Sequence, residues 1–477
     1  MKKLLGSTLA LAMLVPAGAN AQILKNLKLS GQLDVQADSA NNTSDFATRP
    51  GPGGAPANND HIGVAFTRTM VSADWDLLDD VHARVSVVKG ANNGASTTRT
   101  YGTAPQTVSA AALTTTFVQE ANVKIDKLFG ALDTRIGRQY YGESGDLIAF
   151  FGAKDNYGLN VTALDAFRFD WNGEKFGVTA LAGVTANTTG LGTDSATTDL
   201  RALLANFKSE ALNLGVYVYN AVGHNVGGSG VSPTPGVAGG KNDNLYIVGV
   251  KGKVSIGGLL ARAEVDKDLG QNRNAAETAS PITNEQTSAY SGWALLANVA
   301  FKADLGGAGT LTPWGEFGYG SGRSRNNSNH NDGFVSIATD YRPGGIYGRF
   351  DTTSSAKLGS ATPAAGVGAS DGLSNRTIYG AGVKMTPGFA PKLTVGAQGY
   401  KYAFTRTSDT GVFGATQLSR NIGTEGDVTA EWKHSENVSM KLTLGEFLPG
   451  GFFADEKGAN AELNPATLVA LDTTIRF

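Results

Sequence analysis

The sequence lacks several features that would assign it to a familiar class. It contains no cysteine, which excludes disulfide bridges, a lipidated cysteine anchor, thiolate catalysis and cysteine metal sites. After the N-terminal segment there is no run of about 18 apolar residues, the length that a membrane helix needs. Charged residues make up only 17% of the 477 residues, and the net charge of −2 gives no electrostatic reason to bind nucleic acid.

The first 21 residues have the pattern of a secretory signal peptide. Lys2 and Lys3 form a basic head, residues 9–15 are apolar, and Ala19 and Ala21 form a small-residue exit. We predict cleavage after Ala21 and a mature chain of residues 22–477. Without the two lysines, 38 basic residues face 42 acidic ones, a net charge of −4. An exported chain with 63 glycines is either a secreted β-protein or an outer-membrane barrel.

Alternation of apolar and polar residues separates these two possibilities. Near the C-terminus, residues 423–433, 438–447 and 468–477 each place polar side chains on one face and apolar side chains on the other. The same pattern along the chain predicts eighteen strands. They lie near residues 27–37, 61–73, 81–89, 116–125, 131–139, 165–171, 177–185, 198–208, 212–220, 244–253, 259–266, 290–302, 311–320, 377–385, 393–404, 423–433, 438–447 and 468–477.

The predicted connections alternate between long and short, if residues 334–351 are counted as part of a connection. This sorting is typical of outer-membrane barrels, which have long extracellular loops, short periplasmic turns and an even number of strands. We therefore predict an all-β fold, a transmembrane antiparallel β-barrel of 18 strands in the outer membrane of a Gram-negative-type envelope. The terminal Phe477 falls on the apolar face. A C-terminal phenylalanine on such a strand resembles the signal read by the barrel-assembly machinery.

A barrel of about 16–18 strands leaves an aqueous channel, so the strand number predicts passage of small hydrophilic solutes. The residues that we expect to line the translocation path are Arg84, Lys124, Arg135, Arg138, Arg168, Arg262, Lys302 and Lys384. The connection 321–376 is long enough to fold inward as a constriction, with Asp340, Arg342, Arg349 and Asp351 as its charged residues. Basic and acidic residues balance on the predicted inner face, so their totals give no ion preference. Arg68 shares its face with Ile62, Val64 and Phe66, which predicts either a rim position or a phase error in that strand.

Two stretches resemble the alginate-export family of outer-membrane porins. One contains Ile136-Gly137-Arg138-Gln139, Tyr141-Gly142 and Leu164-Asp165-Ala166-Phe167-Arg168, and the other is residues 422–453. The resemblance implies passage of an acidic polysaccharide or related carbohydrate, with Arg135, Arg138 and Arg168 as the matching arginines. Guanidinium groups suit uronate carboxylates because they can bind both oxygens. Small anions, or the mixed solutes of a general porin of low selectivity, are the alternatives.

The sequence gives little support for an enzyme. Its five histidines have no partner in a G-x-S-x-G or H-E-x-x-H motif. We therefore expect no catalytic activity, no cofactor and no metal. The expected partners are outer-membrane lipid, the barrel-assembly machinery and a carbohydrate or small-ion solute, and both a monomer and a trimer remain open.

Overall fold

A computed structural model describes most of the chain between Lys25 and Phe477. The described residues are 25–43, 46, 62–89, 116–185, 198–223, 243–272, 288–322, 330–350, 372–407, 418–457 and 463–477. The predicted signal peptide lies outside these residues. Among the residues described, no helix has the length and apolar character needed to cross a bilayer.

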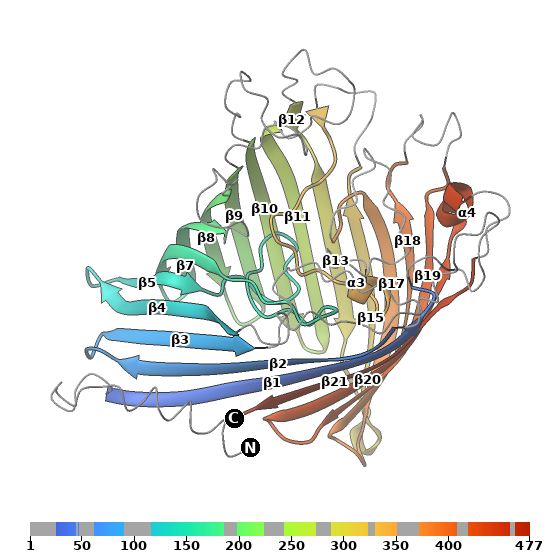
Figure 1. Ribbon diagram of the computed structural model, residues 1–477, viewed down its shortest axis with the longest axis horizontal. Helices are drawn as coiled ribbons and strands as arrows, with labels where there is room; N and C mark the ends of the chain where they lie inside the picture. Colours follow the sequence, from blue (N-terminus) through green and yellow to red (C-terminus); the bar gives the residue numbers. More distant parts are fainter. Residues whose placement is uncertain are drawn as a thin grey trace.

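Antiparallel strands form one sheet that closes on itself (Figure 1). The eighteen long strands are β1 (Lys25–Asn41), β2 (Ile62–Asp76), β3 (Val81–Lys89), β4 (Thr116–Leu128), β5 (Leu132–Gln139), β6 (Leu164–Asn172), β7 (Phe176–Thr185), β8 (Thr198–Lys208), β9 (Leu212–Gly223), β10 (Asp243–Ile256), β11 (Leu259–Asn272), β13 (Trp293–Phe301), β15 (Gly309–Gly320), β17 (Arg376–Pro387), β18 (Leu393–Phe404), β19 (Asn421–Lys433), β20 (Val438–Pro449) and β21 (Ala466–Arg476). The remaining elements are the short strands β12 (Ser288–Tyr290), β14 (Ala303–Asp304) and β16 (His330–Asn331), and the helices η1 (Gly306–Ala308), α3 (Tyr347–Phe350) and α4 (Gly451–Lys457). The predicted eighteen-stranded barrel is confirmed.

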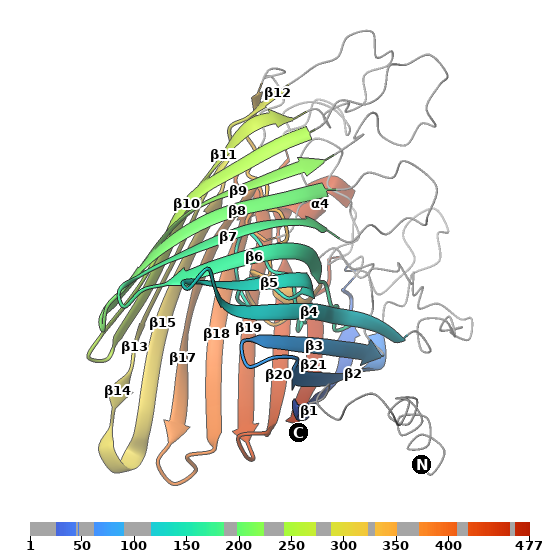
Figure 2. The ribbon, with the colours of Figure 1, turned by 90° about the vertical axis from the view of Figure 1, so that its left-hand side faces the viewer.

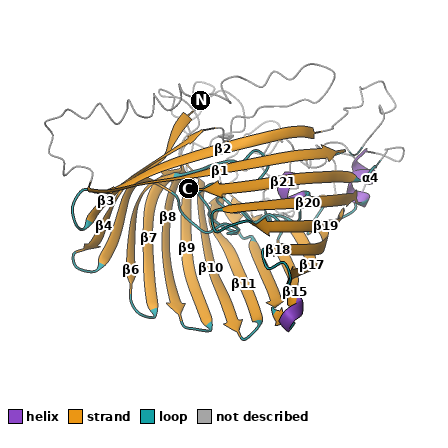
Figure 3. Cartoon of the chain, turned by 90° about the horizontal axis from the view of Figure 1, so that it is seen from below, coloured by secondary structure: helices purple, strands orange, loops and turns teal. Residues whose placement is uncertain are grey.

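The first and last strands close the barrel. β1 pairs with β2 on one side and with β21 on the other (Figure 3). Phe477 extends the seam, because its N–H and C=O both bond to the backbone of Gly31, at N···O distances of 3.0 and 2.7 Å. The Phe477 ring lies over Gly31, where an added Cβ would come within 2.4 Å of the ring. Glycine at this position therefore leaves room for the terminal ring.

The connections are sorted by length between the two ends of the barrel (Figure 2). The short turns lie at the end where the chain terminates, and they comprise residues 77–80, 129–131, 173–175, 209–211, 257–258, 305–308, 388–392 and 434–437. The strand ends that the long connections join lie at the opposite end. Residues 334–351 belong to one of them, as predicted, and the described part contains α3 rather than a long strand.

The outer face of the barrel is apolar. Outward-pointing Phe167, Leu203 and Val428 are 54%, 52% and 55% exposed, respectively. Exposure of large apolar side chains would be unfavourable in water, but it is what a lipid-facing surface requires. The backbone of the closed sheet is hydrogen-bonded from strand to strand, so no edge faces lipid.

Two connections lie inside the barrel and supply much of its core (Figures 1 and 2). We call residues 140–163 the inner loop and residues 334–350 the inner strap. Phe151 of the inner loop and Ile346 and Phe350 of the inner strap are buried in one cluster with wall residues such as Leu164. The core therefore lies between the wall and the infolded chain.

Candidate functional site

The inner loop and the inner strap meet across the barrel interior. Ala149 and Ala338 form a parallel bridge, and the Phe150 N–H donates to the Ala338 carbonyl at 2.8 Å. The Asp340 N–H donates to the Asp146 carbonyl, also at 2.8 Å. Because backbone bonds join them, the two segments form one internal partition rather than two separate loops.

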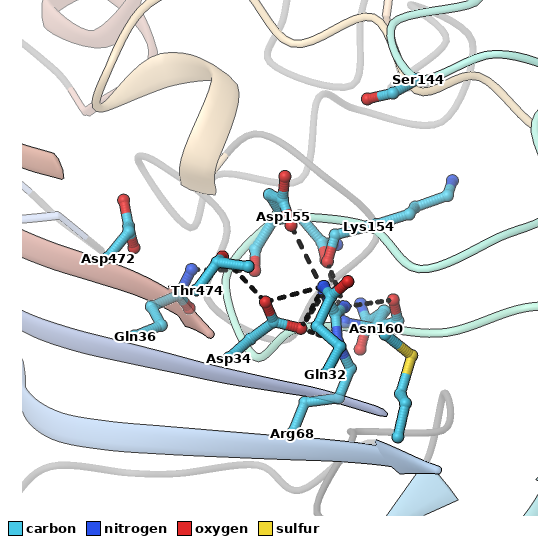
Figure 4. A network of polar contacts seen from close by, with 12 residues as sticks. Gln32, Asp34, Gln36, Arg68, Ser144, Lys154, Asp155, Asn160, Asp472 and Thr474 are labelled. Atoms are coloured by element: carbon cyan, nitrogen blue, oxygen red, sulfur yellow. Dashed lines mark hydrogen bonds and ion pairs between the residues drawn. The ribbon is translucent and has the colours of Figure 1, made fainter. Parts of the chain in front are cut away.

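Arg68 of β2 fastens the inner loop to the wall (Figure 4). Its side chain is fully buried, and its Nε donates to Asp34 Oδ2 of β1 at 2.9 Å. Its Nη1 donates to the Lys154 carbonyl at 2.7 Å, and its Nη2 lies 3.4 Å from Asp155 Oδ1. Of the two expectations for Arg68, the rim position is wrong and the phase error is confirmed, because the face that Arg68 shares with Ile62 and Phe66 is the inner one. It points inward together with Phe66, whose ring packs edge-on against Tyr157 of the inner loop.

Two carboxylates of β19 hold the inner strap. Glu425 accepts the Ile346 and Tyr347 N–H groups at 2.6 and 3.0 Å, and Asp427 accepts the Gly345 N–H at 2.9 Å. Charged acceptors strengthen such bonds relative to neutral ones. These contacts fix the chain at the start of α3.

Arg349 joins the inner strap to the barrel seam. Its Nη1 lies 2.8 Å from Asp38 Oδ1 of β1, and its Nη2 lies 2.6 Å from Asp472 Oδ2 of β21. Burial alone would lower the pKa of the Arg349 guanidinium, but these two carboxylates raise it overall. The arginine therefore stays charged and bridges the first and last strands.

The partition leaves a polar cavity of about 590 Å³ inside the barrel. Its charged lining residues are Asp34, Asp155, Arg262, Glu316, Asp340, Arg342, Arg349, Glu431, Lys441 and Asp472. The basic residues are largely compensated by neighbours. Arg342 lies 3.2 Å from Asp340, and Arg262 lies 2.7 Å from Glu264. The cavity thus offers both signs of charge to a solute.

Two acidic groups of the inner loop also respond to this environment. Burial raises the pKa of the Asp146 carboxyl, although Lys251 of β10 lies 3.2 Å away and opposes the shift. A hydrogen bond from Lys253 lowers the pKa of Glu143. Wall lysines on β10 therefore bind the side of the inner loop opposite to that held by Arg68.

Most of the predicted translocation residues lie on the inner face, many of them in ion pairs. Arg84 contacts Asp74 at 2.9 Å and Glu120 at 2.7 Å. Lys124 and Arg168 lie 2.5 and 2.8 Å from Asp126 and Asp170, respectively. The other inner-face residues of the predicted set are Arg135, Arg262 and Lys384. Lys302 follows β13 and is exposed at the end with the short turns.

The placement of Arg138 in the lumen is wrong. Arg138 lies opposite Asp165 in the β5–β6 register and contacts that carboxylate at 3.0 Å. Asp165 shares the outer face of β6 with the exposed Phe167, whereas Arg135 and Arg168 point inward. Arg138 and Arg135 are three residues apart, and an odd separation along a strand reverses the face.

The inner strap is a described part of the connection that was predicted to fold inward, and it lies inside the barrel. Asp340, Arg342 and Arg349 lie inside the barrel, while Asp351 falls outside the described residues. Asp340 also joins the two segments, because it accepts the Gly145 N–H at 2.9 Å and the Ser144 hydroxyl at 3.1 Å.

The sequence analysis did not predict that the inner loop folds into the barrel, because it counts this segment as an ordinary long connection. A signal was available in the run Leu147-Ile148-Ala149-Phe150-Phe151, which is too apolar for a water-exposed loop and is buried in the structure. The residues missed with it include Ser144, Asp146 and Lys154, which hold the inner loop to the inner strap and the wall. Within the described ranges, no group of three or more His, Asp or Glu side chains is placed to hold a metal ion.

Together these features define an integral outer-membrane β-barrel of the porin type. A closed antiparallel barrel with an apolar outer belt and a polar interior is the β architecture that crosses outer membranes. No family model and no curated protein matches the sequence.

Solved structures show the same fold at low sequence identity. The chain is similar to OccK9 (OpdG) of Pseudomonas aeruginosa, with a TM-score of 0.54 and 10% identity over 95% of this chain and 100% of that one. For OccAB2 of Acinetobacter baumannii the TM-score is 0.53, with 10% identity over 96% of this chain and 99% of that one. For the outer membrane protein opdK of Pseudomonas aeruginosa it is 0.51, with 9% identity over 95% and 99%. The likeness supports the eighteen-stranded porin barrel and does not extend to the alginate-export family in particular.

Proposed function

We propose that the protein is a passive channel for small hydrophilic solutes. The observation that carries this proposal is the polar cavity of about 590 Å³ between the inner loop and the inner strap, within an eighteen-stranded wall. A barrel of this size encloses water unless chain fills it, and here the infolded chain leaves a cavity with charged lining residues. Solutes would cross according to their size and charge.

Planar-bilayer recording of the purified protein tests this proposal. We expect discrete conductance steps, with step size limited by the internal partition. Absence of current from protein that is folded, as judged by its heat-dependent mobility on a denaturing gel, would contradict the proposal.

For the finer selectivity, we propose that acidic carbohydrates and small anions are favoured. Support comes from a row of cations on the inner wall, in which Lys124 lies opposite Arg135 and Arg135 lies opposite Arg168. Like charges placed directly opposite each other destabilise a sheet, so such a row has a cost. Lys124 and Arg168 have carboxylate partners, but the Arg135 guanidinium makes no hydrogen bond or ion pair within the described part of the chain. Arg135 is therefore available to an anionic solute.

Reversal potentials in a salt gradient test this selectivity. We expect an anion-biased current that moves toward the unselective value in Arg135→Gln. Arg138→Gln is the matched control, because it removes an arginine from the outer face of the same strand. An equal response of both variants, or of neither, would argue against a role for Arg135.

A general porin of low selectivity is the second candidate. The mixed charge of the main cavity favours it, since most cationic residues there have a carboxylate within 4 Å. Under this alternative, the current would be close to unselective and oligouronate would not block it.

A further inference from the structure

The outer face of the barrel differs in chemistry between its two ends. Charged side chains gather toward the end with the long connections, and they include Arg138, Asp165, Asp199, Arg201, Lys267, Lys401 and Glu446. Toward the short turns the same face presents large exposed aromatic side chains, among them Trp171, Phe176, Phe301 and Trp432. Lipid at the two ends of the wall therefore meets different groups.

Lys267 of β11 and Lys401 of β18 point away from the barrel interior. Lys267 stands between Asp266 and Asp268 in the sequence, and both of these carboxylates are fully buried. Lys401 follows Tyr400, which lines the main cavity. Successive side chains of a strand take opposite faces, so both lysines lie on the outer face, where both are exposed.

Aromatic side chains cover the outer face beside Lys267. In the sheet register Lys267 lies opposite Trp293, the first residue of β13. The Trp293 ring stacks on Tyr319 of β15, with centroids 4.5 Å apart and an interplanar angle of 30°. Trp293 remains 41% exposed on the lipid side.

A second aromatic pair lies beside Lys401. Lys401 is opposite Tyr379 of β17, and the Tyr379 ring packs 5.3 Å from the ring of Phe317 on β15. The two pairs meet on β15, so they form one surface across five neighbouring strands (Figure 2). We call this surface the outer patch, and it consists of Lys267, Trp293, Phe317, Tyr319, Tyr379 and Lys401.

The two lysines of the outer patch lack acidic partners. Among the described residues neither ammonium group forms an ion pair with a carboxylate, whereas the outward Arg138 has Asp165 at 3.0 Å. The Lys267 ammonium donates to the carbonyl of Ser291, which lies beyond the end of β13. A lysine that faces hydrocarbon is costly, but its long side chain can carry the ammonium group to the level of the headgroups. The outer patch thus offers two positive charges to lipid headgroups.

We propose that the outer patch binds a phosphate-bearing lipid of the outer leaflet, with Lys267 and Lys401 contacting phosphate. The proposal concerns the outside of the wall and is independent of the channel function. Ammonium groups bind phosphate as compact charges, and aromatic side chains favour the boundary between headgroups and acyl chains. The long connections of such barrels are extracellular, so a surface at their end meets the outer leaflet.

A second copy of this chain is a less suitable occupant of the outer patch. Its outward carboxylates Asp165 and Asp199 already have Arg138 and Arg201 as partners, at 3.0 and 3.5 Å. A lipid phosphate supplies the missing negative charge without breaking these pairs.

Native mass spectrometry of the purified protein in neutral detergent tests this proposal, because it reports both bound lipid and oligomeric state. The probes are diphosphoryl lipid A, monophosphoryl lipid A and phosphatidylcholine. We expect saturable binding that is tightest for the lipid with two phosphates and weakest for phosphatidylcholine, whose phosphate is neutralised by its own choline. Lys267→Gln and Lys401→Gln should each raise the apparent Kd for diphosphoryl lipid A by roughly fivefold, the effect of one basic residue near an anionic lipid surface.

Arg138→Gln is the matched control. It also removes an outward cation near the long connections, but from β5, outside the outer patch. We expect this variant to bind diphosphoryl lipid A as wild type does.

A folded Lys267→Gln, Lys401→Gln double variant with wild-type affinity for diphosphoryl lipid A would overturn the proposal. So would equal binding of all three lipids by wild type. A lipid-free oligomer that the double variant cannot form would assign the outer patch to contacts between copies of this chain, and would overturn the lipid assignment. Should the double variant fail to fold, the two single variants provide the same comparison.

Discussion

Replacement of Arg349 by methionine tests how the inner strap is held. Arg349 is nine-tenths buried and contacts Asp38 at 2.8 Å and Asp472 at 2.6 Å. Methionine keeps the length of the side chain but leaves the fully buried Asp38 without its cation. Removing one member of a buried ion pair costs about 3–5 kcal/mol, mostly because the remaining charge is unpaired.

Undocking of the inner strap would relieve this cost, since water could then reach Asp38. At about 1.4 kcal/mol per factor of ten, the equilibrium shifts toward the undocked strap by roughly a hundredfold to several thousandfold. The bonds from Gly345, Ile346 and Tyr347 to the carboxylates of β19 remain and oppose this shift. We therefore expect frequent excursions to an open interior, not complete loss of the strap.

Single-channel recording measures these excursions as larger and noisier current steps. Arg342→Met is the matched control, because Arg342 pairs with Asp340 of its own segment and not with the wall. We expect the control to keep wild-type step size and noise. Arg349→Met channels with wild-type step size and noise would refute the reasoning that Arg349 holds the partition in place.

Three further changes test other parts of the structure. Arg68→Met should lower the unfolding temperature and raise proteolysis within the inner loop, because Asp34 is left buried without its cation, at a cost of about 3–5 kcal/mol; an unchanged melting curve would contradict this. Gly31→Leu should slow assembly into the membrane, since its Cβ would lie 2.4 Å from the Phe477 ring, and an unchanged rate of assembly would contradict this. Arg138→Met should leave step conductance unchanged, because Arg138 lies on the outer face; a large change in conductance would place it in the lumen after all.

The sequence determined the wall of this protein. Successive side chains of a strand point to opposite faces, so a strand with one lipid-facing side has an apolar residue at every second position of its sequence. That is why the eighteen strands, the turn lengths and the outward position of Phe477 could be predicted. For the same reason, Arg84 and Arg168 were correctly predicted to lie on the inner face. The lumen position predicted for Arg138 came from its match to a family motif, although the period of the strand assigns Arg138 to the outer face.

Only the tertiary structure decided what fills the barrel. The inner loop and the inner strap have no period of their own, and their positions depend on contacts between residues far apart in the chain, such as Arg68 with Lys154 and Arg349 with Asp38. The same holds for the contact between the rings of Trp314 on β15 and Tyr400 on β18. These two strands flank β17, and the rings can approach each other across it because β17 carries glycine at both facing positions. Local patterning fixes which face a residue takes, whereas packing across the barrel fixes its neighbours and hence the shape and charge of the passage.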